Sequence, residues 1–348
     1  MKKSRKTLFS LIPFFLHKVL ILFKKHEFKT DIYKRFYTKN VLKTALKNDP
    51  FKKKWHEKEP TNTTSLVNQK ISLKEISLCI IDCINPELSI KAIKKSQHFC
   101  DFENTLFFTD QNLKPSDYFD VVPISSLNSI KAYSHFILKK LHQYIQTSHV
   151  LIIQWDGFVI DPNAWRETFR TVDYIGAKWE WRHDGNNVGN GGFSLRSKRL
   201  LSTTAKDSFK FIENEAEDHQ LCRTYKHELM RNHGIKFADE TMADQFSYER
   251  SMPNIPTFGF HGLFNFWRHH SDEEMINIIS QLTKKNYQSR EFIELLIEYF
   301  LLRKFNLLKL MINQIKQVQT KEEFRSHLFK ITNDKKFSLF LTDLCESL

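Results

Sequence analysis

Residues 149–196 contain the first side chains that could bind a ligand or catalyse a reaction. The apolar run of residues 150–153 leads directly into Gln154-Trp155-Asp156-Gly157, so a carboxylate follows a buried strand. In open α/β sheets ligands bind at the carboxyl ends of strands, and a carboxylate oxygen there can bind a divalent cation. The other interpretation of Asp156-Gly157 is a turn that only ends the strand.

A glycine-rich stretch, VGNGGFSLRS, follows at residues 188–197. Its three glycines, Gly189, Gly191 and Gly192, let the backbone pass close to a bound group. Arg196 can pair with a phosphate, or it is an ordinary surface residue. A strand end that bears a carboxylate and a glycine loop suggest one pocket.

Two further groups of polar residues lie downstream. Glu217 and Asp218 offer a general base, although two acids in the first turn of a helix also stabilise it by opposing its dipole. His261 stands between Phe260 and Gly262, where an imidazole can approach an ion; alternatively, a backbone carbonyl satisfies it. Taken alone, each residue leaves both interpretations open.

Predicted strands and helices alternate along the part of the chain that leads to these residues. Apolar runs predict strands over residues 76–81, 105–110, 120–124 and 150–153. Helical patterns fall between them, over residues 86–96 and 133–146. This alternation predicts a mainly parallel α/β sheet with a Rossmann-like first half.

The second half of the chain turns helical. Leu221, Tyr225 and Leu229 recur every fourth residue and predict one helix over residues 215–232. Ser271 begins a capped helix, several amphipathic helices follow, and no glycine or proline occurs after Gly262. We therefore expect an all-helical C-terminal subdomain.

The net charge of +13 lies entirely in an N-terminal arm. Residues 1–58 hold 17 Lys and Arg against 4 Asp and Glu, which leaves 36 residues of each sign in the rest of the chain. A nucleic-acid binder is expected to spread basic residues over the face that meets phosphate, whereas a basic arm beside an apolar run suits an anionic membrane surface. The distribution therefore disfavours nucleic acid as a partner.

The apolar run in the arm, residues 8–23, is short for a membrane span. It has 16 positions and contains Pro13, His17 and Lys18, whereas a spanning helix needs roughly 20 apolar residues. Its KKSRK lead resembles a signal peptide, but no small-residue cleavage site follows. We expect a segment that lies on a membrane surface; a helix packed on the protein itself and a transmembrane anchor are the alternatives.

The five cysteines are scattered and odd in number, without a CxxC pair or a zinc spacing. They indicate reduced thiols in the cytosol. With the arm, they predict a cytoplasmic protein associated peripherally with the inner face of the cell membrane. The expected domains are an arm and linker over residues 1–72, an α/β domain over 73–268 and a helical subdomain over 269–348.

The order of these motifs resembles that of bacterial glycosyltransferases of the GT-A fold, most closely an uncharacterised glycosyltransferase-like family found around surface-polysaccharide functions. Over about residues 76–265, the resemblance is carried by YSHFILKKL, HVLIIQWDGFVIDPNAW, DYIGAKW, VGNGGFSLRS, EDHQLC, GIKFADETMADQFSYE and FGFHG. It implies a GT-A-like, Rossmann-type mixed sheet flanked by helices. It also implies hexosyltransferase-like transfer from a nucleotide-sugar donor to a cell-surface glycan or lipid-linked acceptor.

The resemblance implies roles for single residues. Asp156 and His261 would bind Mn²⁺ or Mg²⁺ with the donor's diphosphate, Asp218 would be the catalytic base, and Glu217 would orient the acceptor. Donor and acceptor would contact residues at the strand end and in the glycine loop: Gln154, Trp155, Gly189, Asn190, Gly191, Gly192 and Arg196. Gln154 departs from the pattern, because the usual motif has an acid there, so the metal would rest on Asp156, His261 and the donor's diphosphate.

Two other functions compete with this one. A catalytically silent sugar- or nucleotide-binding module, which recruits partners through its helical tail, is favoured by Gln154 and disfavoured by the retained acids and His261. A nucleic-acid-binding protein with a basic arm would show salt-sensitive binding to any oligonucleotide.

Deleting residues 1–58 should release the protein from anionic vesicles, because that segment holds all of the net positive charge. Turnover on a soluble acceptor should stay the same. Co-sedimentation with vesicles at low and high salt measures the first effect, and equal vesicle binding by the full and truncated chains at low salt would contradict it.

Overall fold

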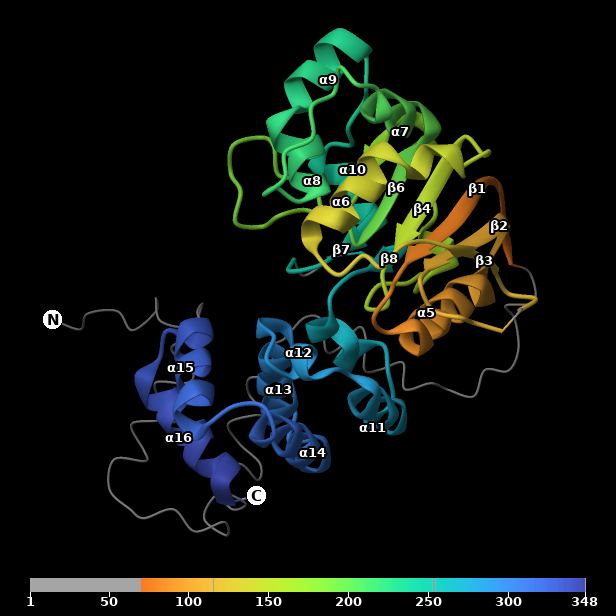
Figure 1. The fold of residues 1–348 in the computed structure, drawn as a ribbon. Helices are drawn as coiled ribbons and strands as arrows, with labels where there is room; N and C mark the ends of the chain where they lie inside the picture. Colours follow the sequence, from red (N-terminus) through yellow and green to blue (C-terminus); the bar gives the residue numbers. More distant parts are fainter. Residues whose placement is uncertain (1–69, 115, 252, 254, 348) are drawn as a thin grey trace, which may run out of the picture. The chain divides into compact units, whose positions relative to one another are not determined.

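The computed structural model describes residues 70–114, 116–251, 253 and 255–347 (Figure 1). The basic arm and the apolar run predicted at residues 8–23 therefore lie outside the described residues. The described chain forms two compact units, divided between His269 and His270. Within the described part, every helix is too short or too polar to cross a bilayer.

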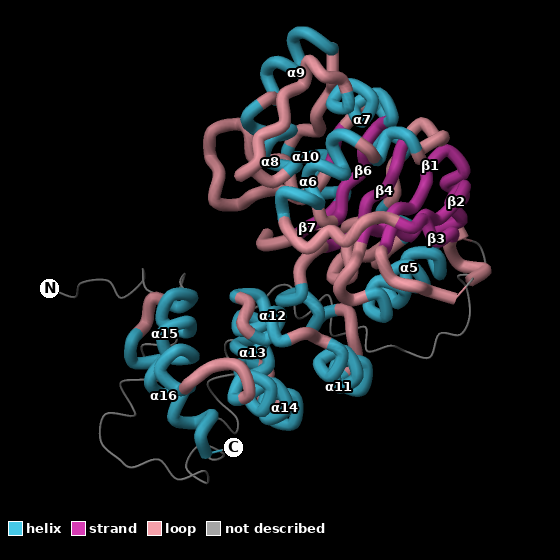
Figure 2. Tube along the Cα trace, in the orientation of Figure 1, coloured by secondary structure: helices cyan, strands magenta, loops and turns pink. Residues whose placement is uncertain are grey.

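A six-stranded mixed sheet lies at the centre of the first unit (Figure 2). In the order β3-β2-β1-β4-β6-β5 it comprises β3 (Asp120–Pro123), β2 (Cys100–Thr109), β1 (Ile71–Ile81), β4 (His149–Ile153), β6 (Phe193–Ser197) and β5 (Tyr174–Ile175). The first four strands in this order are parallel, whereas β6 runs antiparallel to β4 and β5. The predicted mixed α/β sheet is confirmed.

Helices cover both faces of this sheet (Figure 1). α5 (Pro86–Phe99) packs on β1 and β2. α6 (Ile130–Lys139) and α7 (Lys198–Ala205) cover the other face, where their apolar side chains join alternate residues of β1, β2 and β4. The sheet is therefore buried on both sides, as its continuous apolar strands require.

α6 differs from the helix predicted over residues 133–146. It begins earlier because the side chain of Ser129 caps it, accepting the N–H of Ala132 at 3.1 Å. It also ends earlier, at Lys139, and a 3-10 turn (Leu141–Gln143) follows.

The prediction of a single helix over residues 215–232 is wrong for the middle of that range. α8 (Glu217–His219) runs into a π-helical turn (Gln220–Thr224), and α9 (Lys226–His233) begins only after a break at Tyr225. Leu221 and Leu229 are still buried in one core, so the apolar spacing does not reveal the break. π turns are frequent near functional sites, and this one follows α8 directly.

The end of the first unit holds a second, two-stranded sheet. α10 (Glu240–Phe246) leads into β7 (Ser247–Tyr248), which pairs in parallel with β8 (Gly259–Phe260). Three 3-10 helices complete the connections of this unit: Pro162–Ala164, Glu167–Thr171 and Leu263–Arg268.

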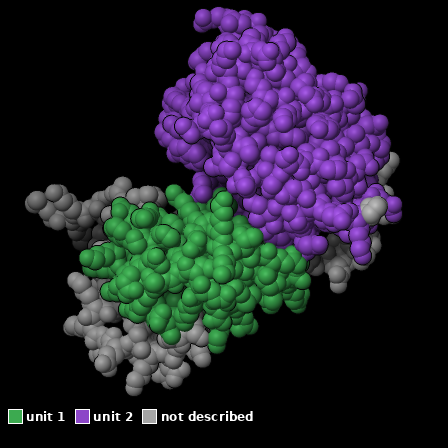
Figure 3. Space-filling model, viewed as in Figure 1, with its two compact units in different colours: residues 1–62, 270–348 green, residues 63–269 purple. Residues whose placement is uncertain are grey.

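The second unit in chain order, from His270 on, is labelled unit 1 and drawn in green in Figure 3. Its described residues are all-helical, as predicted for the tail. It contains α11 (Asp272–Gln281), α12 (Lys284–Tyr287), α13 (Arg290–Leu301), α14 (Phe305–Lys316), α15 (Lys321–Thr332) and α16 (Lys335–Ser347). Ser271 forms a capping box with Glu274, which confirms the predicted start of α11. α13 packs against α14, and α15 packs against α16.

Candidate functional site

The glycine loop lies beside the end of β4 because β4 and β6 are antiparallel. Their register pairs Ile153, the last residue of β4, with Phe193, the first residue of β6. Residues 154–156 therefore leave the sheet where residues 189–192 enter it. The strand order also changes direction between β1 and β4, and open α/β sheets bind ligands at the carboxyl ends of such strands.

β7 and β8 carry His261 to the same place. The backbone N–H of His261 donates to the carbonyl of Tyr248 at 2.9 Å and extends the parallel ladder by one residue. The next N–H, that of Gly262, donates to the carbonyl of Asp156 at 3.0 Å. Gly262 has a φ of 101°, which glycine adopts without strain. Backbone hydrogen bonding thus fixes His261 beside Asp156.

Two side-chain oxygens lie close to Nε2 of the imidazole. Nε2 of His261 lies 3.1 Å from Oε1 of Gln154 and 3.4 Å from Oδ1 of Asp156. That Oδ1 atom is buried and has no hydrogen-bond partner among the described residues. Because lone pairs repel one another, either a hydrogen on Nε2 or a metal ion must lie between Nε2 and these oxygens.

A second carboxylate faces the other side of the ring. Oε1 of Glu249 lies 3.3 Å from Nδ1 of His261. Burial alone would lower the pKa of His261, but the charges of Asp156 and Glu249 outweigh burial and raise that pKa well above its ordinary value. We call Gln154, Asp156, Glu249 and His261 the histidine cluster. Its surplus of negative charge attracts cations.

Two distances in the histidine cluster are close to the spacing of ligand atoms around a divalent cation. Nitrogen and carboxylate ligands lie about 2.0–2.2 Å from such an ion, so adjacent ligand atoms are about 3 Å apart. The distances of 3.1 and 3.4 Å around Nε2 are close to this spacing. No group of three or more His, Cys, Asp or Glu side chains in the described chain could hold a metal ion. Asp156, His261 and the Gln154 amide are therefore at most a partial ligand set, which oxygens of a ligand would have to complete.

Side chains pack directly against the backbone of the glycine loop, where a Cβ atom would overlap them. A Cβ on Gly192 would lie 2.1 Å from Nε2 of His261, and a Cβ on Gly191 would lie 2.4 Å from Oε1 of Glu217. Real Cβ atoms do not approach neighbours below 3.0 Å, so only glycine fits these positions without movement. Gly189 packs in the same way on the ring of Trp179.

Arg196, Glu217 and Asp218 form a second group, the arginine cluster. Arg196 is fully buried and donates to Oε1 of Glu217 at 2.8 Å and to the hydroxyl of Ser194 at 3.0 Å. The sequence left open a phosphate partner or a surface position for Arg196. The structure excludes the surface position and gives the guanidinium a carboxylate partner, because β6 carries the side chain into the core.

Asp218 is the partly exposed acid of the arginine cluster. Its carboxylate accepts the backbone N–H groups of Gly191 at 3.1 Å and His219 at 2.7 Å. Burial, and then the charge of Glu217, raise the pKa of Asp218 to about 7, although Arg196 and the two N–H groups oppose the rise. A carboxyl group with a pKa near 7 suits a general base.

Two other predicted residues support these clusters. Oδ1 of Asn190 accepts the N–H of Gly192 at 3.1 Å, and its Nδ2 atom lies 3.2 Å from Nδ1 of His261. Trp155 is partly exposed, and its ring meets that of Phe266 edge-on at 5.9 Å. Asn190 therefore ties the glycine loop to the imidazole.

Sequence reasoning missed two residues of the site, Glu249 and Tyr133. Tyr133 accepts a hydrogen bond from Nε2 of Gln154 at 3.1 Å, which orients the Gln154 carbonyl toward His261. Glu249 reaches His261 through strands of only two residues, which are too short to produce a recognisable pattern. The side-chain periodicity of α6 would have pointed Tyr133 inward but not to Gln154.

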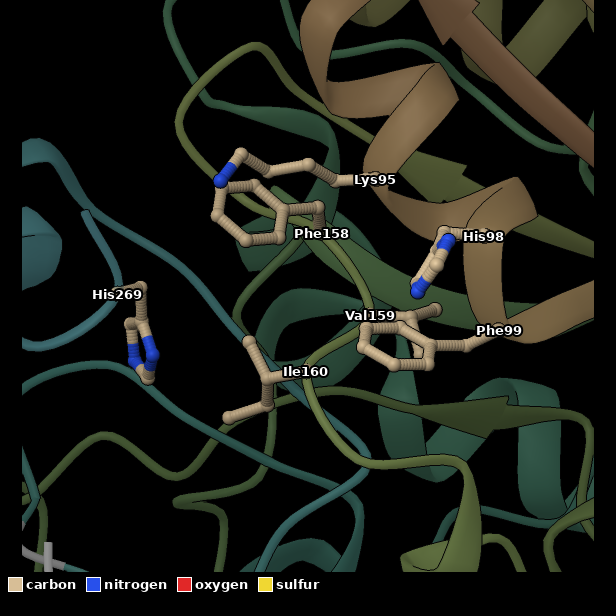
Figure 4. A pocket seen from close by; sticks show the side chains of 7 residues that line it. All are labelled: Lys95, His98, Phe99, Phe158, Val159, Ile160 and His269. Carbon is tan, nitrogen blue, oxygen red and sulfur yellow. The ribbon is translucent and has the colours of Figure 1, made fainter. Parts of the chain in front are cut away.

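A separate cavity of about 260 Å³ lies between α5 and the segment after Gly157 (Figure 4). Its lining combines apolar side chains with a lysine and two histidines: Phe99, Phe158, Val159, Ile160, Lys95, His98 and His269. Lys95 lies over the ring of Phe158 at 5.3 Å. None of the predicted site residues lines this cavity.

The fold and the two clusters define a mixed α/β protein with a polar site at the carboxyl edge of its sheet. Residues 117–261 match a family described as a protein of unknown function, DUF5672. The matched segment is less than half of the chain but contains every residue of both clusters. No curated protein matches the chain.

Three solved structures with some likeness are glycosyltransferases by name. The galactosyltransferase LgtC, with donor and acceptor sugar analogues, is 10% identical over 53% of this chain and 86% of its own, with a TM-score of 0.31. GlyE of Streptococcus pneumoniae TIGR4 is 12% identical over 56% and 54%, with a TM-score of 0.34. The mannosyltransferase PcManGT of Pyrobaculum calidifontis, with GDP-Man and Mn²⁺, is 8% identical over 87% and 96%, with a TM-score of 0.37. Scores this low establish neither the activity nor the ligands of this chain.

Gly192→Ala should displace His261, because the added Cβ would overlap the ring. We expect urea unfolding to report a loss of about 1–3 kcal/mol, the usual cost of forcing an extra carbon into a packed region. Gly185→Ala is the matched control: its Cβ meets no atom within 4 Å, and only its φ of 76° opposes alanine. A Gly192→Ala protein as stable as the Gly185→Ala protein would show that the ring moves freely.

The raised pKa of Asp218 should appear in the pH dependence of stability. The folded protein holds the proton up to about pH 7, whereas an unfolded chain releases it near pH 4, so the free energy of unfolding falls as pH rises between these values. Asp218→Asn should remove this fall. The melting temperature of the variant minus that of the parent should therefore increase between pH 5 and pH 8.

Asp184→Asn provides a control of opposite sign. The hydrogen bonds from Arg223 lower the pKa of Asp184, so this exposed carboxylate contributes stability above pH 4. Melting temperatures that change in parallel for the parent and Asp218→Asn across pH 5–8 would contradict the raised pKa of Asp218.

Proposed function

We propose that this protein is a metal-assisted glycosyltransferase of the GT-A type. It moves a sugar from a nucleotide-sugar donor to a surface glycan or lipid-linked acceptor in bacterial polysaccharide biosynthesis. The observation that carries the proposal is the glycine loop with a cation-attracting cluster packed against Gly192 and a carboxylic acid of pKa about 7 bonded to Gly191. Transfer from a diphosphate to a hydroxyl requires both groups within the width of one sugar.

The histidine cluster would hold the diphosphate end of the donor. Asp156 and His261 supply two ligands to Mn²⁺ or Mg²⁺, and Gln154 adds an amide oxygen. The bound cation would offset the negative charge that develops on the leaving diphosphate. The nucleoside end would lie at the ends of β1 and β4, where the strand order changes direction.

Asp218 would take the proton of the acceptor hydroxyl. As the hydroxyl oxygen bonds to the anomeric carbon, the bond from that carbon to the diphosphate breaks, and the proton passes to a carboxylate oxygen of Asp218. The charge of Glu217, which pairs with Arg196, raises the pKa of Asp218 and so makes Asp218 a stronger base. Glu217 would act on the acceptor through this effect and through the position of Gly191.

One observation favours the competing function, a silent sugar- or nucleotide-binding module. Gln154 is neutral, and the described residues hold no complete set of protein metal ligands. Such a module would bind the nucleotide without turnover and would use its helical unit to recruit partners. Donor binding without any hydrolysis or transfer would identify it.

The test of the proposed function is a thermal-shift screen of nucleotide sugars with Mn²⁺, followed by two variants of the protein. A donor at 100 times its dissociation constant raises stability by about 2.7 kcal/mol, which is readily measured. Asp156→Asn should lose the Mn²⁺-dependent part of the shift. Asp218→Asn should keep it but lose about 10²- to 10⁴-fold in turnover, because general base catalysis contributes that much.

Asp218→Asn serves as the control for Asp156→Asn in the binding measurement, because it should leave Mn²⁺-dependent donor binding intact. Equal Mn²⁺-dependent binding by the parent and Asp156→Asn would contradict the metal site. Equal turnover by the parent and Asp218→Asn would contradict the base and make Glu217 the next acid to replace.

A further inference from the structure

Glu249 is a buried carboxylate that the proposed reaction leaves without a role. The parallel pairing of β7 with β8 sets Tyr248 opposite Phe260, so Glu249 and His261 are the next pair in the same register. Side chains of paired residues in a sheet lie on the same face. The small sheet therefore delivers a carboxylate directly to the imidazole, with 3.3 Å between Oε1 of Glu249 and Nδ1 of His261.

Asn265 holds the two backbones at this spacing. Its buried Nδ2 group donates to the carbonyl of Glu249 and to the carbonyl of His261, each at 2.8 Å. The bridge continues the pairing beyond the last hydrogen bond of the ladder. Glu249 is thus fixed next to the ring and does not reach it as a flexible surface acid.

Two side chains compete for Nδ1 of His261, and they require opposite tautomers. Asn190 presents its amide nitrogen at 3.2 Å, because its oxygen already accepts the N–H of Gly192. That contact is a hydrogen bond only if Nδ1 is unprotonated. Glu249 presents an acceptor, which is a hydrogen bond only if Nδ1 carries the proton. A charge-assisted hydrogen bond is about twice as strong as a neutral one, so Glu249 prevails.

Which of the two ring nitrogens carries the proton decides whether Nε2 can bind a cation. With the proton on Nδ1, Nε2 presents a lone pair toward Gln154 and Asp156, and the three atoms together suit a cation. With a neutral ring protonated on Nε2 instead, that proton would occupy the same position. Metal-binding histidines commonly donate their other N–H to a carboxylate for this reason.

We propose that Glu249 is a positioning residue that keeps a proton on Nδ1 of His261 and so leaves Nε2 free to bind a divalent cation beside Asp156. The proposal rests on the proposed function for the identity of the cation's task. Glu249 itself touches neither the cation nor the substrate.

The first test measures Mn²⁺ affinity of the full chain by electron paramagnetic resonance, with UDP and with GDP. Loss of a carboxylate partner of a metal-binding histidine typically costs 10- to 100-fold in affinity. We expect about tenfold for Glu249→Gln, which keeps an acceptor without the charge, and a larger loss for Glu249→Leu. Glu180→Gln, which removes an exposed carboxylate from the same unit, should bind Mn²⁺ as the parent does.

The second test needs no metal. Nitrogen-15 spectra of histidine-labelled protein, with His261 assigned by comparison with His261→Ala, report which ring nitrogen carries a proton. The spectra are recorded up to the pH at which the imidazolium has lost one proton, because only the neutral ring has a tautomer to compare. In the parent the neutral ring should keep its proton on Nδ1. In Glu249→Leu the neutral ring should carry its proton on Nε2, and Nδ1 should accept from Asn190.

The two tests separate this inference from the proposed function. A parent that binds no Mn²⁺ with either nucleotide contradicts the metal-assisted function, and the nitrogen spectra then decide the role of Glu249 alone. Unchanged Mn²⁺ affinity in Glu249→Gln and Glu249→Leu would overturn the positioning role while the metal site stands. An unprotonated Nδ1 in the neutral ring of the parent would overturn it as well.

Discussion

The antiparallel pairing of β4 with β6 is the constraint on which both clusters depend. It sets the exit of β4 and the entrance of β6 at one edge, so the carboxylate of Asp156 and the glycine loop meet although about thirty residues separate them in sequence. A shift of one residue in this register would move every side chain of β6 to the other face. Arg196 would then lie on the face that now holds Leu195 and would lose Glu217.

Each cluster buries charge, and the two balance it differently. In the arginine cluster the guanidinium of Arg196 faces one ionised carboxylate, that of Glu217, so the pair is neutral. Removing one member of such a pair typically costs 3–5 kcal/mol, because the other charge stays buried. In the histidine cluster one imidazole faces the two carboxylates of Asp156 and Glu249, and a negative charge remains. The first cluster is thus a closed ion pair, whereas the second can accept a cation.

How much could be predicted from sequence depended on the length of the elements. The strand before Gln154 and the glycine loop were predictable, because a long apolar run and three close glycines are strong local signals. The burial of Arg196 was not, because it depends on β6 being central and on Glu217 arriving from a distant helix. The π turn after α8 escaped because Leu221 and Leu229 remain buried on either side of it.

Glu249 could not be predicted from the sequence because it lies beside a strand of only two residues. In the proposed metal-bound state, its position would account for the departure at Gln154. With a proton on Nε2 the histidine cluster carries two carboxylates and one imidazolium, a net charge of −1. Replacing that proton by a divalent cation raises the charge by one and makes the cluster neutral. An acid at position 154 would add a third carboxylate and restore the surplus. In the proposed metal-bound state, Glu249 therefore supplies from behind the ring the negative charge that the resembled motif places at position 154, and a neutral Gln154 is the residue that balances it.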